Sequence, residues 1–285
     1  MASSGEKVDF EGARAPIGAR RGALTGTRPP VELTARGGTP HVLALHGFGG
    51  TPYDVECVVR AAEEAGLEAL APVLPGHGTH ARELSPLRFV DFARGVDEAI
   101  ERLDGPVIAV GLSLGSLLVL DLALRRPQHV RALALLGNAV WLTAPYPRWA
   151  LMLAERLRFP DFMAPRRGAD IVDVVTRARH VGYDAHPVHA AIDVRRAGER
   201  LRGELGAIRA PTLVLHGAKD RVCPVENAWK VAAALGSDDL RVIVFPRSAH
   251  ILTCDVESNA VRAELVAYFR RFAEPRVAAQ LPVEP

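Results

Sequence analysis

Short apolar runs alternate with segments of helical period along most of this chain, and this alternation is the feature that most constrains its fold. Six uncharged or weakly charged runs are found at 41–45, 67–73, 107–112, 130–136, 212–216 and 240–245. Between them lie helical patterns at 53–65, 87–103, 114–126, 225–235 and 256–272. Strands that are apolar on both faces, each followed by a helix, are typical of a parallel sheet covered by helices on both sides. The sequence therefore predicts an α/β protein with a mostly parallel sheet.

The alternation is interrupted once, between about Trp141 and Glu204. Strand-like runs stop there, and mostly helical patterns punctuated by five prolines take their place. We interpret 141–204 as a helical cap inserted in the second half of a core formed by 30–140 and 205–273. Residues 1–29 and 274–285 have no clear period, and we expect both ends to be flexible. Arginines of the cap, among them Arg166, alternate with acidic residues, which favours a solvated mixed face.

A serine between two glycines follows the best strand candidate of the chain. Gly111-Leu112-Ser113-Leu114-Gly115 matches the pattern G-x-S-x-G and stands between the strand 107–112 and the helix 114–126. Such a strained turn needs glycines because a neighbouring Cβ would collide with the strand or the helix. The pattern alone is common by chance, but this setting exposes the serine hydroxyl above the sheet. Ser113 is therefore the predicted nucleophile.

A serine hydroxyl needs a base, and the base needs a carboxylate that fixes its tautomer. In proteins with this motif the order along the chain is serine, acid, histidine. Of the ten histidines, only His250 follows a late strand and precedes the last helix. Asp220 follows the strand 212–216 and is the predicted acid, since the stretch 137–140 after the preceding strand has no carboxylate. Asp255 stands too close to His250 to be its partner, and we expect it to cap the final helix.

Stabilising an oxyanion on the substrate requires fixed donors, ordinarily two backbone N–H groups. One is expected from Leu114, the residue after the nucleophile, and the other from Phe48. Phe48 lies in the glycine-rich loop 46–50 that follows the strand 41–45. Since the chain itself supplies nucleophile, base and oxyanion donors, we expect no metal and no cofactor.

Taken together, these motifs resemble the bacterial carboxylesterase and monoacylglycerol lipase family of α/β hydrolases. The resemblance rests on the loop 46–52, the turn 74–80, the motif 111–115, the Asp220 turn and 248–250, in this order. It covers about 40–138 and 211–272, and it implies the α/β-hydrolase fold. It also implies hydrolysis of short- to medium-chain carboxylic esters, including monoacylglycerols, through an acyl-enzyme intermediate. The chain departs from the family pattern at Ser116, where relatives usually have glycine, and the cap shows no residue-by-residue match.

One cap segment, 148–158, predicts an amphipathic helix. Its apolar residues recur at helical spacing: Trp149, Met152, Leu153 and Leu157. If this helix covers Ser113, then Trp149 and Met152 are candidates for the wall of an acyl pocket. A pocket of this kind predicts a preference for short to medium acyl chains over acetyl esters and bulky triacylglycerols.

Charge and cysteine content indicate which partners and which cellular compartment suit this protein. The net charge is +2 and the basic residues are spread along the chain, which gives no footprint for nucleic acid. Three cysteines without C-x-x-C spacing predict free thiols in a reducing compartment. Residues 1–28 lack the apolar region of a secretory signal, and no apolar run is long enough to span a membrane. We therefore expect a cytoplasmic protein, either a monomer or a homodimer, that acts on a small ester.

Other functions remain compatible with the same three residues. A thioesterase, an acyltransferase or a peptidase uses a Ser-Asp-His arrangement in the same way. A ligand-binding protein can retain this fold without useful turnover. Activity against p-nitrophenyl esters, with Ser113→Ala as control, separates ester hydrolysis from binding alone.

Overall fold

The computed structural model describes residues 22–142, 162–166 and 168–273 of the chain. Its centre is a seven-stranded sheet in the order β1-β3-β2-β4-β5-β8-β9. The strands are β1 (Leu33–Ala35), β2 (Gly38–Leu45), β3 (Leu67–Ala71), β4 (Val107–Leu112), β5 (Val130–Leu136), β8 (Thr212–Gly217) and β9 (Leu240–Phe245). β1 runs antiparallel to β3, and all other neighbours are parallel. The predicted α/β architecture is confirmed.

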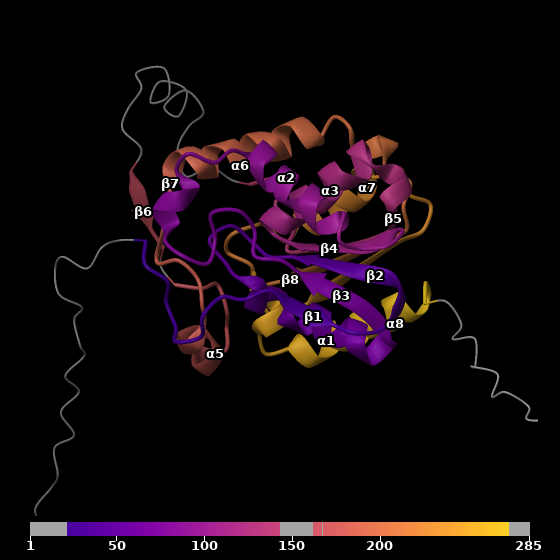
Figure 1. The fold of residues 1–285 in the computed structure, drawn as a ribbon, viewed down its shortest axis with the longest axis horizontal. Helices are drawn as coiled ribbons and strands as arrows, with labels where there is room; N and C mark the ends of the chain where they lie inside the picture. The colour runs from indigo at the N-terminus through magenta and orange to yellow at the C-terminus, as the bar shows by residue number, and fades with distance from the viewer. Residues whose placement is uncertain (1–21, 143–161, 167, 274–285) are drawn as a thin grey trace, which may run out of the picture.

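Helices cover both faces of the sheet (Figure 1). On one face α1 (Glu56–Ala65) packs against α8 (Ser258–Arg270). On the other lie α2 (Phe89–Ile100), α3 (Leu114–Arg125) and α7 (Asn227–Ala234), with α6 (Val188–Leu201) packed on α2 and α3. None of the described helices is long and apolar enough to cross a membrane.

The central strands contribute side chains to two cores, one on each face of the sheet. In β5, Leu133 and Leu135 join one core, whereas Ala132, Ala134 and Leu136 join the other. Both faces are covered, so such a strand is apolar at nearly every position, and Arg131 is the exposed exception in β5. This burial is why the six predicted strands are all present. β1 was missed because three residues at the sheet edge are too few to show a pattern.

The segment between β5 and β8 contains more than helices. β6 (Met163–Pro165) and β7 (Ala185–Pro187) form a separate two-stranded antiparallel sheet, and α5 (Val174–Arg179) lies between them in sequence. The expectation that strands stop in this segment was wrong for these six residues. Each strand has three residues and ends in proline, so neither shows the alternation by which a strand is recognised.

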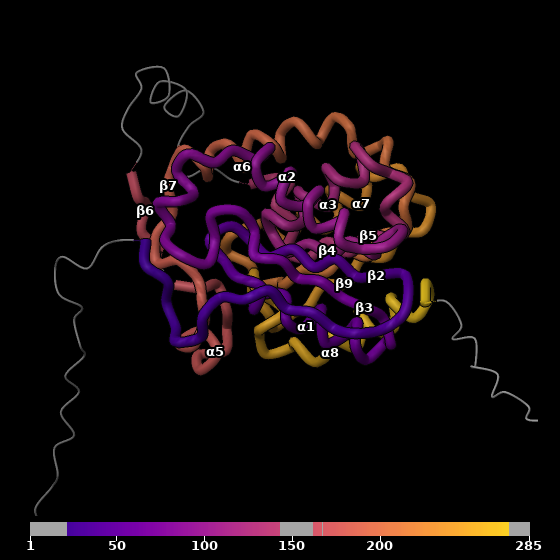
Figure 2. The backbone as a smooth tube through the Cα atoms, viewed as in Figure 1, coloured from indigo at the N-terminus to yellow at the C-terminus, as the bar shows by residue number. Residues whose placement is uncertain are grey.

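Residues 22–29, which the sequence places in a flexible terminus, contact the inserted segment. The Gly22 N–H donates to Asp184 Oδ1 at 2.6 Å, and the Thr25 N–H donates to Gly182 O at 2.8 Å. Figure 2 shows this indigo start of the described chain running beside the insertion. The N-terminal chain is therefore tied to the insertion before the core begins.

Candidate active site

Ser113 stands on a strained turn between β4 and α3. Its φ is 55°, and among the described non-glycine residues only Ser113 has a positive φ. A Cβ on Gly111 would lie 2.1 Å from Gly115 O, and a Cβ on Gly115 would lie 2.1 Å from Leu45 O. Both distances are far below van der Waals contact, so the turn forms only with glycine at both positions. The turn has the shape that the G-x-S-x-G pattern predicts.

Ser116 ties this turn to the end of the neighbouring strand. Its Oγ donates to Ser113 O at 2.5 Å and accepts from the Ala139 N–H at 3.2 Å, and the residue is fully buried. The hydroxyl thus satisfies a buried N–H that glycine would leave without this acceptor. The departure from the family pattern therefore adds a contact to the turn.

A cavity of about 540 Å³ opens where β2, β4 and β9 end, and Ser113 lines it. Its volume falls within the usual range for small-molecule pockets, roughly 300–1,000 Å³. Phe48, Leu114 and His250, all predicted site residues, also line this cavity. The structure therefore brings together residues that are far apart in sequence.

His250 is hydrogen-bonded to Asp220, with 2.7 Å between Nδ1 and Oδ2. The other carboxylate oxygen accepts from the N–H groups of Val222 at 2.8 Å and Cys223 at 2.7 Å. Burial alone would raise the pKa of Asp220, but His250, a bond from His216 and the Cys223 N–H outweigh it and hold that pKa well below its usual range. Asp220 is therefore an ionised acceptor that orients the His250 ring.

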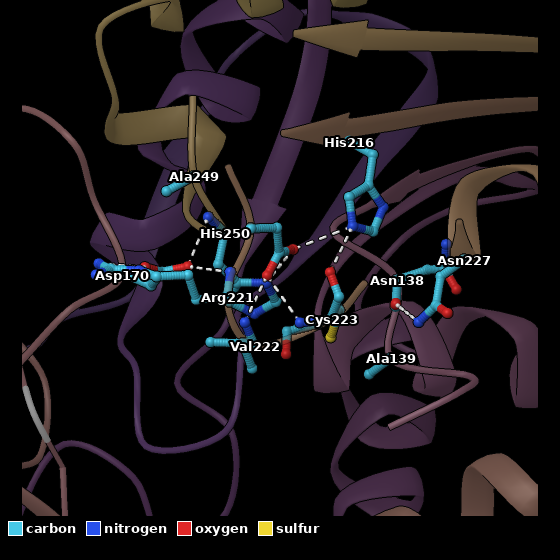
Figure 3. Close-up of polar contacts among 12 residues, drawn as sticks. Asn138, Ala139, Asp170, His216, Arg221, Val222, Cys223, Asn227, Ala249 and His250 are labelled. Atoms are coloured by element: carbon cyan, nitrogen blue, oxygen red, sulfur yellow. Dashed lines mark hydrogen bonds and ion pairs between the residues drawn. The ribbon is translucent and has the colours of Figure 1, made fainter. Parts of the chain in front are cut away.

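His216 supplies a second ring donor to the same carboxylate (Figure 3). Its Nε2 lies 3.1 Å from Asp220 Oδ2 and 3.1 Å from Cys223 O, and the residue is fully buried. Both neighbours are acceptors, so Nε2 carries the proton. Sequence reasoning gave His216 no role beyond ending a strand, although its spacing of four residues from Asp220 was visible.

Asp170, from the insertion, binds the loops of both predicted residues. Its Oδ2 accepts from the Arg221 N–H at 2.9 Å and from the His250 N–H at 3.2 Å. The Arg221 side chain also pairs with Oδ1 at 2.6 Å. Figure 3 shows Asp170 and His216 on opposite sides of His250. No sequence pattern indicated Asp170, because its partners lie 51 and 80 residues away.

Asp255 does not cap the final helix, so that prediction was wrong. α8 begins at Ser258, and the Asp255 carboxylate instead accepts from the backbone N–H groups of Val172, Asp173 and Ala249 at 2.7–3.0 Å. A buried carboxylate is stabilised best where several donors converge, and here the insertion and the His250 loop supply them. Asp255 thus joins the insertion to the loop before His250.

The loop 46–50 lies against Ser113 and is supported from the core. A Cβ on Gly47 would lie 3.3 Å from Ser113 Cβ. His77, in the turn 74–80, accepts the Gly49 N–H at Nε2 (3.0 Å) and donates from Nδ1 to Pro75 O (3.0 Å). Burial lowers the pKa of His77 to about 3, so the ring is neutral as this arrangement requires. The turn holds the loop, and His77 is not among the residues that line the cavity.

The insertion contacts the same loop and the short helix that follows it, Pro52–Val55. The Tyr183 N–H donates to Gly49 O at 2.8 Å, and His180 Nε2 lies 2.8 Å from Asp54 Oδ1. Burial alone would raise the pKa of Asp54, but the charge and hydrogen bond of His180 outweigh it and lower that pKa. The loop that carries Phe48 is therefore fixed by groups from both regions of the chain.

Comparison with known proteins gives one family for this arrangement. Residues 39–257 match the Hydrolase_4 family model, described as "Serine aminopeptidase, S33". The chain belongs to this family of α/β hydrolases. The match spans both halves of the core and the insertion between them.

Curated relatives of this Hydrolase_4 protein are named as lipases and esterases. A thermostable monoacylglycerol lipase of Bacillus sp. (strain H-257) is 24% identical over 88% of this chain and 97% of its own. A carboxylesterase of Bacillus subtilis (strain 168) is 23% identical over 85% of this chain and 97% of its own. The resemblance inferred from the motifs is confirmed.

Solved structures show the same fold. The structure described for the metagenome-derived lipolytic enzymes LipS and LipT has a TM-score of 0.78 at 23% identity, over 87% of this chain and 100% of that one. The monoacylglycerol lipase of Paleococcus ferrophilus has a TM-score of 0.74 at 21% identity, over 85% of this chain and 99% of that one. The predicted α/β-hydrolase fold is therefore confirmed.

Two predicted pocket residues of this Hydrolase_4 chain, Trp149 and Met152, lie outside the described residues. Arg166 differs from its expected place on a solvated face, because its side chain lines the cavity. His186, from the same insertion, also lines the cavity. Neither residue belongs to a motif, so only the folded insertion reveals their position.

Within the described residues, one group of three side chains has metal-ligand chemistry and close spacing: Asp220, Cys223 and His250, with ligand atoms within 4.8 Å of one another. The Asp220 and His250 atoms already bond to each other. Burial, together with the Asp220 charge, raises the pKa of the Cys223 thiol well above its usual range. A thiolate ligand is disfavoured at this position, so the group fits a hydrogen-bonded pair better than a metal site.

Proposed function

We propose that this protein is a serine hydrolase that cleaves carboxylic esters through an acyl-enzyme intermediate. One observation carries the proposal: Ser113, on its strained turn, and His250, bonded to the ionised Asp220, line a single cavity. A serine, a histidine and a carboxylate in these roles suit acyl transfer to water. The names of the monoacylglycerol lipase and carboxylesterase relatives support the same reaction.

In the proposed mechanism Ser113 Oγ attacks the ester carbonyl while His250 Nε2 takes the hydroxyl proton. The tetrahedral oxyanion accepts hydrogen bonds from the backbone N–H groups of Leu114 and Phe48. His250 then gives its proton to the departing alcohol, which leaves Ser113 acylated. Water, losing a proton to His250, then attacks the acyl carbonyl. The bond to Ser113 breaks, the acid is released, and His250 returns the proton to Ser113 Oγ. Asp220 holds His250 Nδ1–H throughout and stabilises the transient imidazolium.

The proposed substrates are short- to medium-chain esters, including monoacylglycerols. A cavity of about 540 Å³ suits a small ester, and we expect bulky triacylglycerols to be poor substrates. The family description raises aminopeptidase activity as an alternative, and such an enzyme must bind a substrate ammonium group. The two carboxylates that line the described cavity, Asp54 and Asp170, are already paired with His180 and Arg221. This pairing favours esters over amino-terminal peptides.

We propose further that the enzyme needs no metal or organic cofactor, since its own groups supply nucleophile, base and oxyanion donors. Dialysis against a chelator should leave kcat unchanged, and activity restored by a divalent ion would contradict this. We propose a monomer or a homodimer. Three unpaired cysteines support a reducing, cytoplasmic setting.

A chain-length series tests the function. p-Nitrophenyl esters from acetate to decanoate should show kcat/KM rising severalfold per two-carbon step to a maximum at short to medium length, since each buried methylene contributes about 0.8 kcal/mol. Ser113→Ala should abolish turnover across the series. An optimum at acetate, faster cleavage of emulsified triolein, or preferential cleavage of aminoacyl p-nitroanilides would contradict the proposal.

A further inference from the structure

The charged side chains that line the cavity are not equally compensated. Asp170 pairs with Arg221 at 2.6 Å, and Asp54 lies 2.8 Å from His180. The remaining charged lining residue, Arg166, has no carboxylate within 4 Å in the described ranges of the chain. Arg166 is therefore a cationic wall without an anionic partner from these residues.

The hydrogen bonds of Arg166 leave much of its guanidinium free. Nη1 donates to Gly49 O at 3.3 Å and to Tyr183 O at 3.4 Å, and both acceptors are neutral carbonyls. Nε and Nη2 have no acceptor among the residues that the structure describes. Burial lowers the pKa of Arg166, and the more distant charge of Asp54 only partly opposes this. Arginine stays protonated in proteins, so this partly buried charge persists without full compensation.

The neighbours of Arg166 add no second permanent cation on this wall. His186 lines the same cavity, and its ring lies 5.9 Å from the Phe48 ring in an edge-on arrangement. Burial, with the Arg166 charge, lowers the pKa of His186 to about 4, so this ring is neutral at neutral pH. The wall beside Phe48 therefore presents one positive charge and a neutral imidazole that can hydrogen-bond.

We propose that Arg166 binds a carboxylate carried by the substrate, so that the preferred esters are anionic. A guanidinium forms its strongest contacts with a carboxylate, which can take two of the unused N–H donors at once. Nη1 contacts the carbonyl of Gly49, the residue after Phe48, so a short chain would join this carboxylate to the ester carbonyl. This inference rests on the proposed ester hydrolysis and narrows its substrate class.

The test compares two matched pairs of esters. p-Nitrophenyl hydrogen glutarate and p-nitrophenyl pentanoate differ in a carboxylate on the acyl chain, and 4-acetoxybutanoate and butyl acetate differ in one on the alcohol. In at least one pair, Arg166→Gln should reduce the ratio of kcat/KM for the anionic ester to that for the neutral ester at least tenfold. Arg166→Lys should retain part of this ratio. Arg94→Gln, on the exposed face of α2, makes the same change in net charge and should leave the ratio unchanged.

Equal loss with anionic and neutral esters, or an unchanged ratio in both pairs, would overturn the inference, since a residue that only supports the Gly49 loop affects both esters alike. A binding measurement keeps this test independent of turnover. Ser113→Ala protein should bind at least one intact anionic ester at least tenfold more tightly in calorimetry than Ser113→Ala/Arg166→Gln protein. Equal binding would again overturn it. Failure of the proposed function is a different result: no neutral or anionic ester is cleaved by the parent.

Discussion

The Ser113 turn and the insertion hold the site in different ways. The turn is set by apolar burial and sterics: β4 and α3 are packed in the core, and a Cβ added to either glycine of the motif would lie 2.1 Å from a backbone oxygen. Where the insertion meets the site loops it is held by polar contacts, chiefly those of Asp170, His180 and Tyr183, whereas its helix α6 packs in the core. Packing in a core allows one arrangement, whereas polar contacts on loops can vary from one relative to another. The core therefore fixes the chemistry, and the insertion adjusts loops and substrate.

The largest expected effect falls on the core side. Ser113→Ala and His250→Ala should each lower kcat by at least about four orders of magnitude, because neither group acts without the other. The double variant should lose little more than either single variant. Steady-state kinetics with p-nitrophenyl butyrate measures all three, and losses that add would contradict a shared role.

Gly115→Ala tests whether steric contacts fix the Ser113 turn. Its Cβ would meet Leu45 O at 2.1 Å, so the turn or the strand must shift. The free energy of unfolding should fall by about 3–5 kcal/mol in urea titrations. Gly203→Ala is the matched control, since its Cβ would meet only Arg200 O at 3.8 Å. Equal stability of the two variants would show that the turn is not sterically fixed.

Asp170→Ala tests whether polar contacts of the insertion position the His250 loop. His250 and Arg221 would lose an acceptor, and a shift of about 1 Å in the His250 loop lowers kcat by about a hundredfold. KM for a neutral ester should change much less, because Asp170 acts through the loops. Asp104→Ala removes an exposed carboxylate and serves as control. A rise in KM with an unchanged kcat would assign Asp170 to substrate binding.

The smallest expected effect is on the pH dependence of stability. It distinguishes the His77 contact with the loop 46–50 from the contact between Asp54 and the insertion. The pKa of His77 is lowered from 6.5 to about 3, so between these values the unfolded chain binds a proton that the folded chain does not. Stability should therefore fall as the pH falls, and His77 accounts for about 2 kcal/mol between pH 6 and 4.5. His77→Gln should make the fall shallower in urea titrations. Parallel curves for the variant and the parent would place the acid sensitivity elsewhere.

The Asp54 carboxylate, which contacts His180 of the insertion, titrates at lower pH. Its pKa is lowered by His180, so its contribution is present above the unfolded value, near 3.8, and is lost as the pH falls through the lower folded value. The part of the acid sensitivity above pH 4.5 that His77→Gln removes thus belongs to the core support of the loop, since His186 also has a lowered pKa and titrates in this range, and loss near pH 3 includes the contact of Asp54 with the insertion.

The sequence by itself determined the sheet and the predicted site residues, for local reasons. A strand buried on both faces is apolar at nearly every position, and a serine turn of this shape requires glycines two residues to each side. The order of serine, acid and histidine then identified Ser113, Asp220 and His250 as candidates. The structure places His250 with Asp220, and places Ser113 and His250 on one cavity.

Only the tertiary structure decided which groups surround these residues. Asp170, His180 and Arg166 contact residues between 17 and 126 positions away, and no period or spacing records such contacts. The same limit explains the short strands of the insertion and the wrong role expected for Asp255. A local pattern reports how much of a side chain is buried, because burial repeats along a strand or helix. It does not report which polar partner a buried side chain meets, because that depends on how distant segments pack.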